Sequence, residues 1–472
     1  MTSSPVPNAD PLKVVASPSK LMGKLMEHVD TLITARWVIP IEPGGCVLDE
    51  HALAIRQGRI VAIEPAKQAV ARFSAGERID CPTHVLLPGL VNAHTHAAMT
   101  LLRGAAESAS FETWLKQQIR PLEQRWVDAE YVRDGTELAI ADMLTSGTTC
   151  FADMHLFSEV VAQAASAAKI RACVGLPVID TASVWAGSAD EYLEKGLQLH
   201  DEYRDDPLIT TALAPYAPWA VSDETLLRVR RAADELDLPM TMHVNETRAE
   251  AIVNGERTLA RLERLGLLSQ LMSAVHMVHV DESDLDLAAR GGISIAHCPQ
   301  SNLKLGNGVC PVPAIRSRGI NIALGTDGAA SNNDLNLLDE MRTAALLASG
   351  LTTSGANTGT GMNMSSLGAH DWLQIATLNG AQALGISDAI GSLVPGKWAD
   401  LCCIDLARAH TQPVYDPASQ LVYAVSRDQV TDVWVAGRRL VAAGRLTHMD
   451  VEDILQRAQR WQQRIATDRP HR

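Results

Sequence analysis

Amphipathic stretches alternate with short apolar runs through the middle of the chain, from about residue 89 to about residue 385. The stretches have helical periodicity, and each run has the length and composition of a buried strand. The predicted helix–strand pairs are 132–146 with 148–153, 223–236 with 240–243, 259–268 with 273–276, 283–290 with 293–297, and 314–318 with 321–327. Repeated pairs imply parallel strands joined by crossovers. About eight such units favour a (β/α)8 barrel over an open doubly wound sheet.

Both ends of the chain show shorter, alternating patterns that are typical of β-strands. The N-terminal runs cover residues 29–35, 52–56 and 59–63, and the C-terminal runs cover 399–405, 430–437 and 439–441. Gly and Pro residues separate them. The sequence therefore predicts a small sheet or sandwich at each end of an α/β barrel.

Composition narrows the class of protein. The 472 residues carry a formal charge of −14, from 41 basic and 55 acidic side chains, which argues against a nucleic-acid-binding surface but not against a nucleoside substrate. The 8 cysteines have no zinc-finger spacing and read as buried free thiols. Neither a secretory signal nor an apolar run long enough to span a membrane is evident, so the expected location is the cytoplasm, without a membrane partner.

The most informative motif is His94-Thr95-His96, which follows an apolar run. Imidazoles at i and i+2 project from the same face of a strand and can share one metal ion. His243, His276 and Asp327 also lie at or just past short apolar segments. The carboxyl ends of barrel strands would bring these groups together. Three imidazoles and one Asp suit Zn²⁺ or another first-row metal with an open position for water.

Several of these residues have a second interpretation. Asp327 precedes Gly328 and could cap the following turn instead of binding a metal and accepting a proton from its water. Glu246 could move protons above the metal or simply open the next helix. Of His276 and His279, only one can point into the barrel mouth if the segment is extended; we expect His276, where the apolar run ends. His297 is expected beside the site and not as a ligand.

The chain resembles the amidohydrolase superfamily, and within it the 5-methylthioadenosine/S-adenosylhomocysteine deaminases and their adenosine-deaminating relatives. The resemblance covers nearly everything after about residue 29. The motifs that carry it are Pro88-Gly-Leu-Val-Asn-Ala-His94-Thr-His96, Met99-Thr-Leu-Leu-Arg-Gly104, Trp114-Leu115, Pro121-Leu-Glu123, His243-Val-Asn-Glu246-Thr247, Ser301-Asn-Leu-Lys-Leu-Gly306, Gly325-Thr-Asp-Gly-Ala-Ala-Ser331-Asn-Asn333 and Gly391-Ser-Leu-Val-Pro-Gly-Lys-Trp-Ala-Asp400.

The resemblance implies a distorted (β/α)8 TIM-like barrel with a small β-sandwich domain built from the N- and C-terminal segments. The expected divisions are a disordered arm at 1–25, sandwich segments at 26–86 and 391–450, the metal-dependent barrel at 87–390 and a C-terminal helix at 451–472. It also implies one Zn²⁺ per subunit, with Fe²⁺ as the other option, because the strand around Phe151 lacks the lysine that bridges two metals in other members. A barrel of this kind often assembles through its outer helices, so a homo-oligomer is compatible with the sequence.

The family pattern also implies roles for individual residues. The metal ligands would be His94, His96, His243 and Asp327, and the catalytic residues Glu246, His276 and Asp327. Glu246 would protonate the purine ring and then the leaving ammonia, and His276 would orient the attacking hydroxide. The reaction would convert an adenine nucleoside into its inosine analogue. Substrate contacts are expected from Trp114, Glu123, Tyr216, Glu246, Asp327 and Ser331.

One departure affects the expected substrate. Relatives commonly carry Pro-His-Ser/Ala-Pro-Tyr, with a histidine near the ribose, where this chain has Tyr216 in the histidine position of Pro215-Tyr-Ala-Pro-Trp219. Tyr216 can still donate a hydrogen bond. No arginine occurs in residues 174–178 or 182–190 to bind a homocysteine carboxylate. These features favour adenosine or 5′-methylthioadenosine over S-adenosylhomocysteine. The alternatives are a guanine or pterin deaminase, a triazine-type chlorohydrolase, or a barrel that has lost catalysis.

Overall fold

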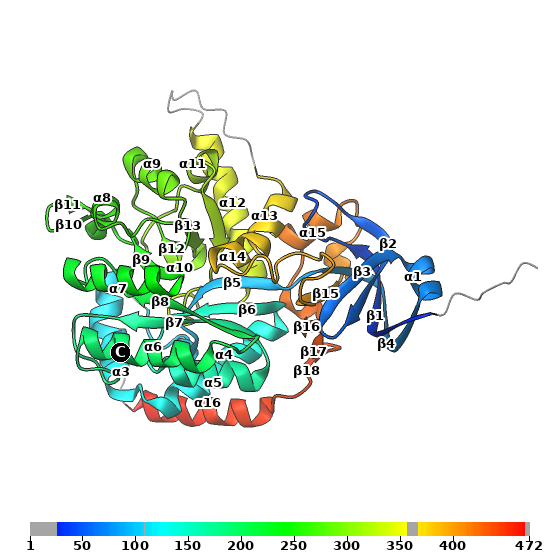
Figure 1. Ribbon diagram of the computed structural model, residues 1–472, viewed down its shortest axis with the longest axis horizontal. Coiled ribbons are helices and arrows are strands. Elements are labelled where there is room, and N and C mark those ends of the chain that lie inside the picture. Colours follow the sequence, from blue (N-terminus) through cyan, green and yellow to red (C-terminus); the bar gives the residue numbers. More distant parts are fainter. Residues whose placement is uncertain (1–25, 108–109, 356–366, 468–472) are drawn as a thin grey trace, which may run out of the picture.

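A parallel barrel and a second sheet at its side make up the protein (Figure 1). The computed structural model describes residues 26–107, 110–355 and 367–467. The arm expected at residues 1–25 lies outside them. The C-terminal helix, expected at 451–472, is α16 (Val451–Ala466) in the described part of the chain.

Eight parallel strands form the barrel, as the sequence predicted. In spatial and chain order they are β5 (Leu90–Thr95), β6 (Thr148–Asp153), β7 (Arg171–Val178), β8 (Ile209–Pro215), β9 (Met240–Val244), β12 (Met272–His276), β13 (Ser294–His297) and β14 (Asn321–Leu324). The pairing of β8 with β9 is limited to Leu213 opposite Met240, so the barrel is distorted at this junction.

The helices predicted from periodicity are all present. They are α4 (Ala129–Thr145), α7 (Asp223–Leu236), α8 (Thr258–Arg264), α9 (Glu282–Gly291) and α11 (Val312–Ser317). Ser222 begins α7 by accepting a hydrogen bond from the Thr225 amide, and Asp281 begins α9 in a capping box with Asp284. The other barrel helices are α5 (Ser158–Ala168), α6 (Ala189–Tyr203), α10 (Pro299–Lys304), α12 (Leu337–Gly355), α13 (Ala369–Ile375) and α14 (Leu378–Ala383).

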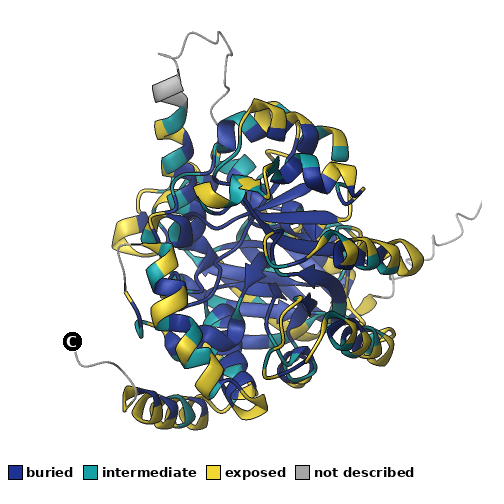
Figure 2. Cartoon of the chain, turned by 90° about the vertical axis from the view of Figure 1, so that its left-hand side faces the viewer, coloured by how far each residue is buried: buried dark blue, intermediate teal, exposed yellow. Residues whose placement is uncertain are grey.

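Burial follows from this arrangement. The strands at the centre are almost wholly buried, whereas the helices around them are buried on one side and exposed on the other (Figure 2). Every residue of β5, β6 and β7 is buried. Parallel strands covered on both faces are mostly apolar, which explains why their sequences show apolar runs and not alternation.

The second sheet joins the two ends of the chain. Its strands are β1 (Glu27–Val38), β2 (Leu48–Arg56), β3 (Arg59–Pro65), β4 (Phe73–Pro88), β15 (Leu401–Asp405), β16 (Val430–Val435), β17 (Arg438–Ala442) and β18 (Arg445–Leu446). The N-terminal strand β4 pairs antiparallel with the C-terminal strand β15, with Leu86 opposite Cys403. Strand β4 then leads through Gly89 directly into β5, so the sheet is fixed to the start of the barrel.

Short elements fill the connections. They are α1 (Ala66–Arg72), η1 (Ala97–Leu102), α2 (Phe111–Thr113), η2 (Trp114–Ile119), α3 (Arg120–Trp126), η3 (Arg248–Ala251), β10 (Ile252–Val253), β11 (Glu256–Arg257), η4 (Ala409–Thr411), α15 (Pro417–Tyr423) and η5 (Arg427–Gln429). Among the described helices, none combines the length and apolar character that crossing a bilayer requires.

A buried ion pair ties the barrel to the C-terminal segment. The Arg171 guanidinium, on β7, donates to both carboxylate oxygens of Asp400 at 2.8 and 3.2 Å. Both side chains are at most 5% exposed. Asp400 also accepts the Ala436 amide at 2.7 Å, so one carboxylate connects strands of both sheets.

We expect Arg171→Met to lower the free energy of unfolding by about 3–5 kcal/mol, because it leaves a buried carboxylate without its cation. Urea denaturation would measure the change. Lys116→Met is the matched control, since it breaks an exposed pair with Glu112 and should leave the denaturation midpoint where it was. Equal midpoints for the two variants would show that the buried pair does not hold the sheets together.

Candidate metal centre and active site

Three histidines converge at the carboxyl end of the barrel. His94 lies on β5, His96 directly follows that strand, and His243 lies on β9. One ring nitrogen from each lies within 4.8 Å of the other two. The Nε2 atoms of His96 and His243 are 3.3 Å apart. The structure thus brings together three residues from the ends of two strands that are far apart in the sequence.

Backbone carbonyls orient two of these rings. Nδ1 of His96 lies 2.5 Å from the Met154 carbonyl oxygen, and Nδ1 of His243 lies 2.7 Å from that of Tyr216. A carbonyl oxygen can only accept, so each Nδ1 carries the hydrogen and each Nε2 presents a lone pair. Such partners fix the tautomer of metal-binding histidines.

Asp327 completes the cluster. It follows β14 in the left-handed region, with φ of 60°, and its Oδ1 lies 3.4 Å from Nε2 of His96 and 3.8 Å from Nε2 of His94. Oδ2 accepts the Ser301 hydroxyl at 2.6 Å. Burial opposes ionisation of Asp327, but the neighbouring imidazoles outweigh it and lower the pKa of this carboxyl.

The donor set fits a single divalent metal ion. Nε2 of His94 is buried and has no hydrogen-bond partner among the described residues. Two imidazole lone pairs face each other across 3.3 Å, an arrangement that a shared cation relieves. Burial lowers the pKa of His243 to about 3, so the ring is neutral at physiological pH, as a metal ligand must be.

Glu246 and His276 form an acid–base pair beside this cluster. Nε2 of His276 lies 3.6 Å from Oε2 of Glu246. The Asn307 amide donates to Oε1 of Glu246 at 2.8 Å, and Nδ1 of His276 lies 2.9 Å from the Asn302 carbonyl oxygen. Burial, followed by the charges of Glu250 and Asp327, raises the pKa of Glu246 well above 4.5. Glu246 can therefore hold a proton at neutral pH.

Two further histidines, His279 and His297, lie outside the metal cluster. Nε2 of His279 lies 2.7 Å from the Asn307 carbonyl oxygen, outside the metal cluster. His297 ends β13 and is buried, without joining the three clustered rings. The segment after β12 is not extended, however. His276 and Met277 both have positive φ, 75° and 50°, so a turn and not strand alternation separates His276 from His279.

A cavity of about 820 Å³ opens above the cluster, a size suited to a small ligand. It is lined by Trp114, Glu123, Tyr216, Glu246, Asp327 and Ser331, which are the expected substrate contacts. Trp114 is 4% exposed, and the Tyr216 ring lies 4.9 Å from that of His243. The Ser331 hydroxyl donates to the Gly328 carbonyl at 2.9 Å, as in an ordinary turn.

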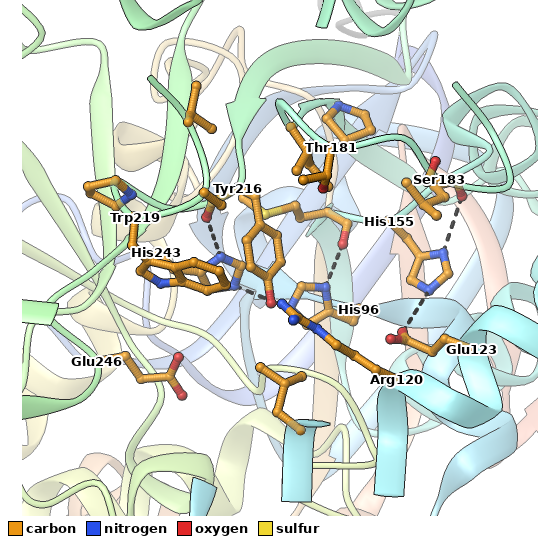
Figure 3. A pocket seen from close by; sticks show the side chains of 18 of the residues that line it. His96, Arg120, Glu123, His155, Thr181, Ser183, Tyr216, Trp219, His243 and Glu246 are labelled. Atoms are coloured by element: carbon orange, nitrogen blue, oxygen red, sulfur yellow. Dashed lines mark hydrogen bonds and ion pairs between the residues drawn. The ribbon is translucent and has the colours of Figure 1, made fainter. Parts of the chain in front are cut away.

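Glu123 and His155 lie on one side of His96, and His243 and Glu246 on the other (Figure 3). Oε1 of Glu123 is 3.8 Å from Nε2 of His155. Burial raises the pKa of Glu123 to about 7, against the opposing charges of His96 and Arg120. Burial, and then His96, lower the pKa of His155 to about 4, so this ring is neutral.

One arginine lines the cavity from a segment other than 174–178 and 182–190, which contain none. It is Arg120, at the start of α3. Its guanidinium carbon lies 5.6 Å from the centre of the Trp219 ring. Among the described residues, no carboxylate is within ion-pair distance of it.

Sequence reasoning also missed the residues that hold the catalytic groups. Ser301, Asn302 and Asn307 contact Asp327, His276 and Glu246, respectively. Ser301 and Asn302 lie in a motif already recognised, so their polar character was the available signal. His155 directly follows Met154, whose carbonyl orients His96.

Comparison with known proteins agrees with this geometry. Residues 85–440 match the amidohydrolase family. A 5-methylthioadenosine/S-adenosylhomocysteine deaminase from Teredinibacter turnerae is 43% identical over 445 residues, which are 93% of this chain and 99% of that protein. An adenosine deaminase from Xanthomonas campestris, solved with bound zinc, is 46% identical with a TM-score of 0.90, covering 94% of this chain and all of that one. An atrazine chlorohydrolase from Arthrobacter aurescens, solved with zinc, shares the fold at 24% identity and a TM-score of 0.83, over 91% and 99% of the chains.

The chain therefore belongs to the amidohydrolase family, among the 5-methylthioadenosine/S-adenosylhomocysteine deaminases. It is accordingly a hydrolase that acts on C–N bonds of cyclic amidines. The family is metal-dependent, and the three clustered histidines are the candidate ligands here.

Removal of one clustered imidazole should abolish stoichiometric metal binding. We expect the purified enzyme to carry one Zn²⁺ per subunit and His243→Ala to retain less than about a tenth of it, because even partners that only orient a ligand contribute 10–100-fold to affinity. Elemental analysis after dialysis measures this directly. His200→Ala is the control, since His200 bonds Thr211 away from the cluster. Equal zinc in both variants would place the metal elsewhere.

Proposed function

We propose that this enzyme hydrolytically deaminates adenine nucleosides, with adenosine and 5′-methylthioadenosine as substrates, and releases ammonia and the inosine analogue. The observation that carries the proposal is a proton-holding Glu246 next to a three-histidine and aspartate cluster. The Teredinibacter turnerae and Xanthomonas campestris relatives, at 43% and 46% identity, are named as deaminases of such nucleosides. The 8 free cysteines suit a reducing cytoplasm, which we propose as the site of action.

The residues divide the chemistry between them. We propose that His94, His96, His243 and Asp327 hold one Zn²⁺. When bound, such an ion lowers the pKa of a water molecule toward neutrality and so supplies the nucleophile. The carboxylate of Asp327 has a lowered pKa, and in this role it would accept a proton from the nucleophile.

Glu246 carries the proton that the purine needs. Deamination at C6 requires a proton on the ring nitrogen to draw electrons from the carbon, and later a proton on the leaving amine. Glu246 is buried, burial raises the pKa of its carboxyl group well above 4.5, and the Asn307 amide donates to this group. His276, held by Asn302, offers a neutral Nε2 that can accept a hydrogen bond from the attacking water.

The alternative substrates fit the pocket less well. A guanine deaminase and the chlorohydrolases share the fold with this chain at 20–24% identity, which is evidence of fold alone. The cavity instead offers a carboxylate, Glu123, on the opposite side of His96 from Glu246 (Figure 3). A ribose attached to the purine would reach it, whereas a free base would leave it unpaired.

Glu246→Gln should lower kcat for adenosine by about 10²–10⁴-fold while the enzyme keeps its zinc, because the amide fills the same space but cannot transfer a proton. The loss of adenosine absorbance, or ammonia release, measures the rate, and elemental analysis checks the metal. Glu263→Gln, which alters an exposed carboxyl group that pairs with Arg290 outside the cavity, is the control. Full activity in Glu246→Gln would exclude this residue as the acid. A zinc-loaded wild type that deaminates no adenine nucleoside would refute the proposed function.

Arg120 favours a second substrate, S-adenosylhomocysteine. Its guanidinium faces the cavity, stacks near Trp219 and has no carboxylate partner among the described residues. The other arginine of the cavity, Arg261, is already bonded to Asp223 and to backbone carbonyls. A guanidinium without a partner matches the carboxylate of a homocysteine tail.

We expect Arg120→Met to lower kcat/KM for S-adenosylhomocysteine by roughly 10–100-fold, the effect of losing a charged hydrogen bond. The value for 5′-methylthioadenosine, which has no carboxylate, should change less than about twofold. Arg120→Lys keeps the charge but not the bidentate donor geometry. Its kcat/KM for S-adenosylhomocysteine should therefore lie between those of the wild type and Arg120→Met. An equal loss of kcat/KM on both substrates would mean that Arg120 supports the structure of the pocket and does not bind the homocysteine tail.

A further inference from the structure

Glu123 and His155 form a pair that the proposed chemistry does not use. Glu123 lies on α3, and His155 follows β6, so separate elements bring them to one wall of the cavity. Their nearest atoms, Oε1 and Nε2, are 3.8 Å apart, which is too far for a direct hydrogen bond. His155 is 7% exposed, so its ring is held almost entirely by the protein.

The pair presents two acceptors and no donor between them. Nδ1 of His155 lies 3.2 Å from the Leu156 carbonyl oxygen, and because a carbonyl only accepts, Nδ1 carries the hydrogen. Nε2 therefore presents its lone pair, and no described side chain donates to it. An ionised Glu123 is also an acceptor. A ligand with two adjacent donors satisfies both acceptors when Glu123 is ionised.

We propose that His155 binds substrate together with Glu123, and that the two acceptors receive hydrogen bonds from the vicinal 2′- and 3′-hydroxyls of the ribose. This inference rests on the proposed function and refines it. It makes His155 a residue that determines specificity for ribonucleosides over deoxynucleosides. A deoxynucleoside would leave one buried acceptor unpaired, which costs binding energy.

The position of His155 also accounts for a departure noted in the sequence. The family that the chain resembles commonly carries a histidine near the ribose at the position of Tyr216, which directly follows β8. Here an imidazole enters the same cavity from the end of β6. The cavity therefore keeps a ring nitrogen beside Glu123, although the chain supplies it from a different strand.

A purely structural role for His155 predicts a different result. If the ring only supported Glu123 or the wall of the cavity, its loss would lower kcat/KM for every nucleoside to the same extent. If it binds a hydroxyl, its loss matters only for nucleosides that have that hydroxyl. Comparison of adenosine, 2′-deoxyadenosine and 3′-deoxyadenosine separates the two.

The experiment measures kcat and KM for these three nucleosides with the zinc-loaded wild type, His155→Leu and His155→Gln. We expect His155→Leu to lower kcat/KM for adenosine about tenfold, mainly through KM. For the deoxynucleoside that lacks the hydroxyl bound by His155, the change should be less than about twofold. His155→Gln, which keeps an acceptor oxygen, should recover part of the loss, and this variant also serves if His155→Leu folds poorly.

His200→Leu provides a matched control, because it removes a partly buried histidine outside the cavity and should affect all three nucleosides equally. Equal losses on the three nucleosides in His155→Leu and His155→Gln would overturn the assignment of His155 while leaving the deaminase in place. A wild type that holds zinc but deaminates none of them would instead refute the proposed function, and the ribose site with it.

Discussion

The seam where β14 meets β5 holds the candidate centre together. The Asn92 side chain accepts the Thr326 amide at 3.0 Å and donates to its hydroxyl at 2.8 Å, and the Asp327 amide donates to the His94 carbonyl at 3.0 Å. These bonds close the barrel and place Asp327 opposite the two histidines of β5. The approach is close, since a Cβ on Gly325 would lie 2.9 Å from that of His94. A side chain there would separate the carboxylate from the imidazoles.

The backbone at three strand ends departs from the ordinary conformation. Asn245, His276 and Asp327 all have positive φ, between 53° and 75°, although none is a glycine. Each such residue costs on the order of 1–3 kcal/mol. Local bonds offset this cost, as when the Gly328 amide donates to Oδ1 of Asp327. The turns aim His276 and Asp327 inward, where an extended backbone would carry them past the cavity.

The sequence was sufficient for the barrel and for the groups at its strand ends, because both depend on patterns local to the chain. Apolar runs predict strands. A His or Asp at the end of such a run lies at the carboxyl end of the barrel, and this position does not depend on the conformation of the loops. Asn307, Arg120 and His155 could not be predicted in this way. Asn307 reaches Glu246 across 61 residues of sequence, and only the path of the intervening loop makes that contact. The arginine was sought on β7 and its loop, whereas α3 supplies it.

The strand ends and the segment that contains α3 contribute different residues to the cavity, and this difference concerns substrate specificity. The strand ends provide proton transfer and metal ligands, which a deaminase of a different purine or a chlorohydrolase on this scaffold needs as well. The segment 110–126, inserted between β5 and α4, provides Trp114, Arg120 and Glu123. It includes a π-helical turn at Trp114–Ile119, and the wider turn presents Arg120 and Glu123 to one cavity. This segment lies outside the repeating helix–strand units, although it packs on the barrel through the buried Trp114, Leu115 and Ile119. We propose that substrate choice depends chiefly on this segment and on His155, which lines the same cavity.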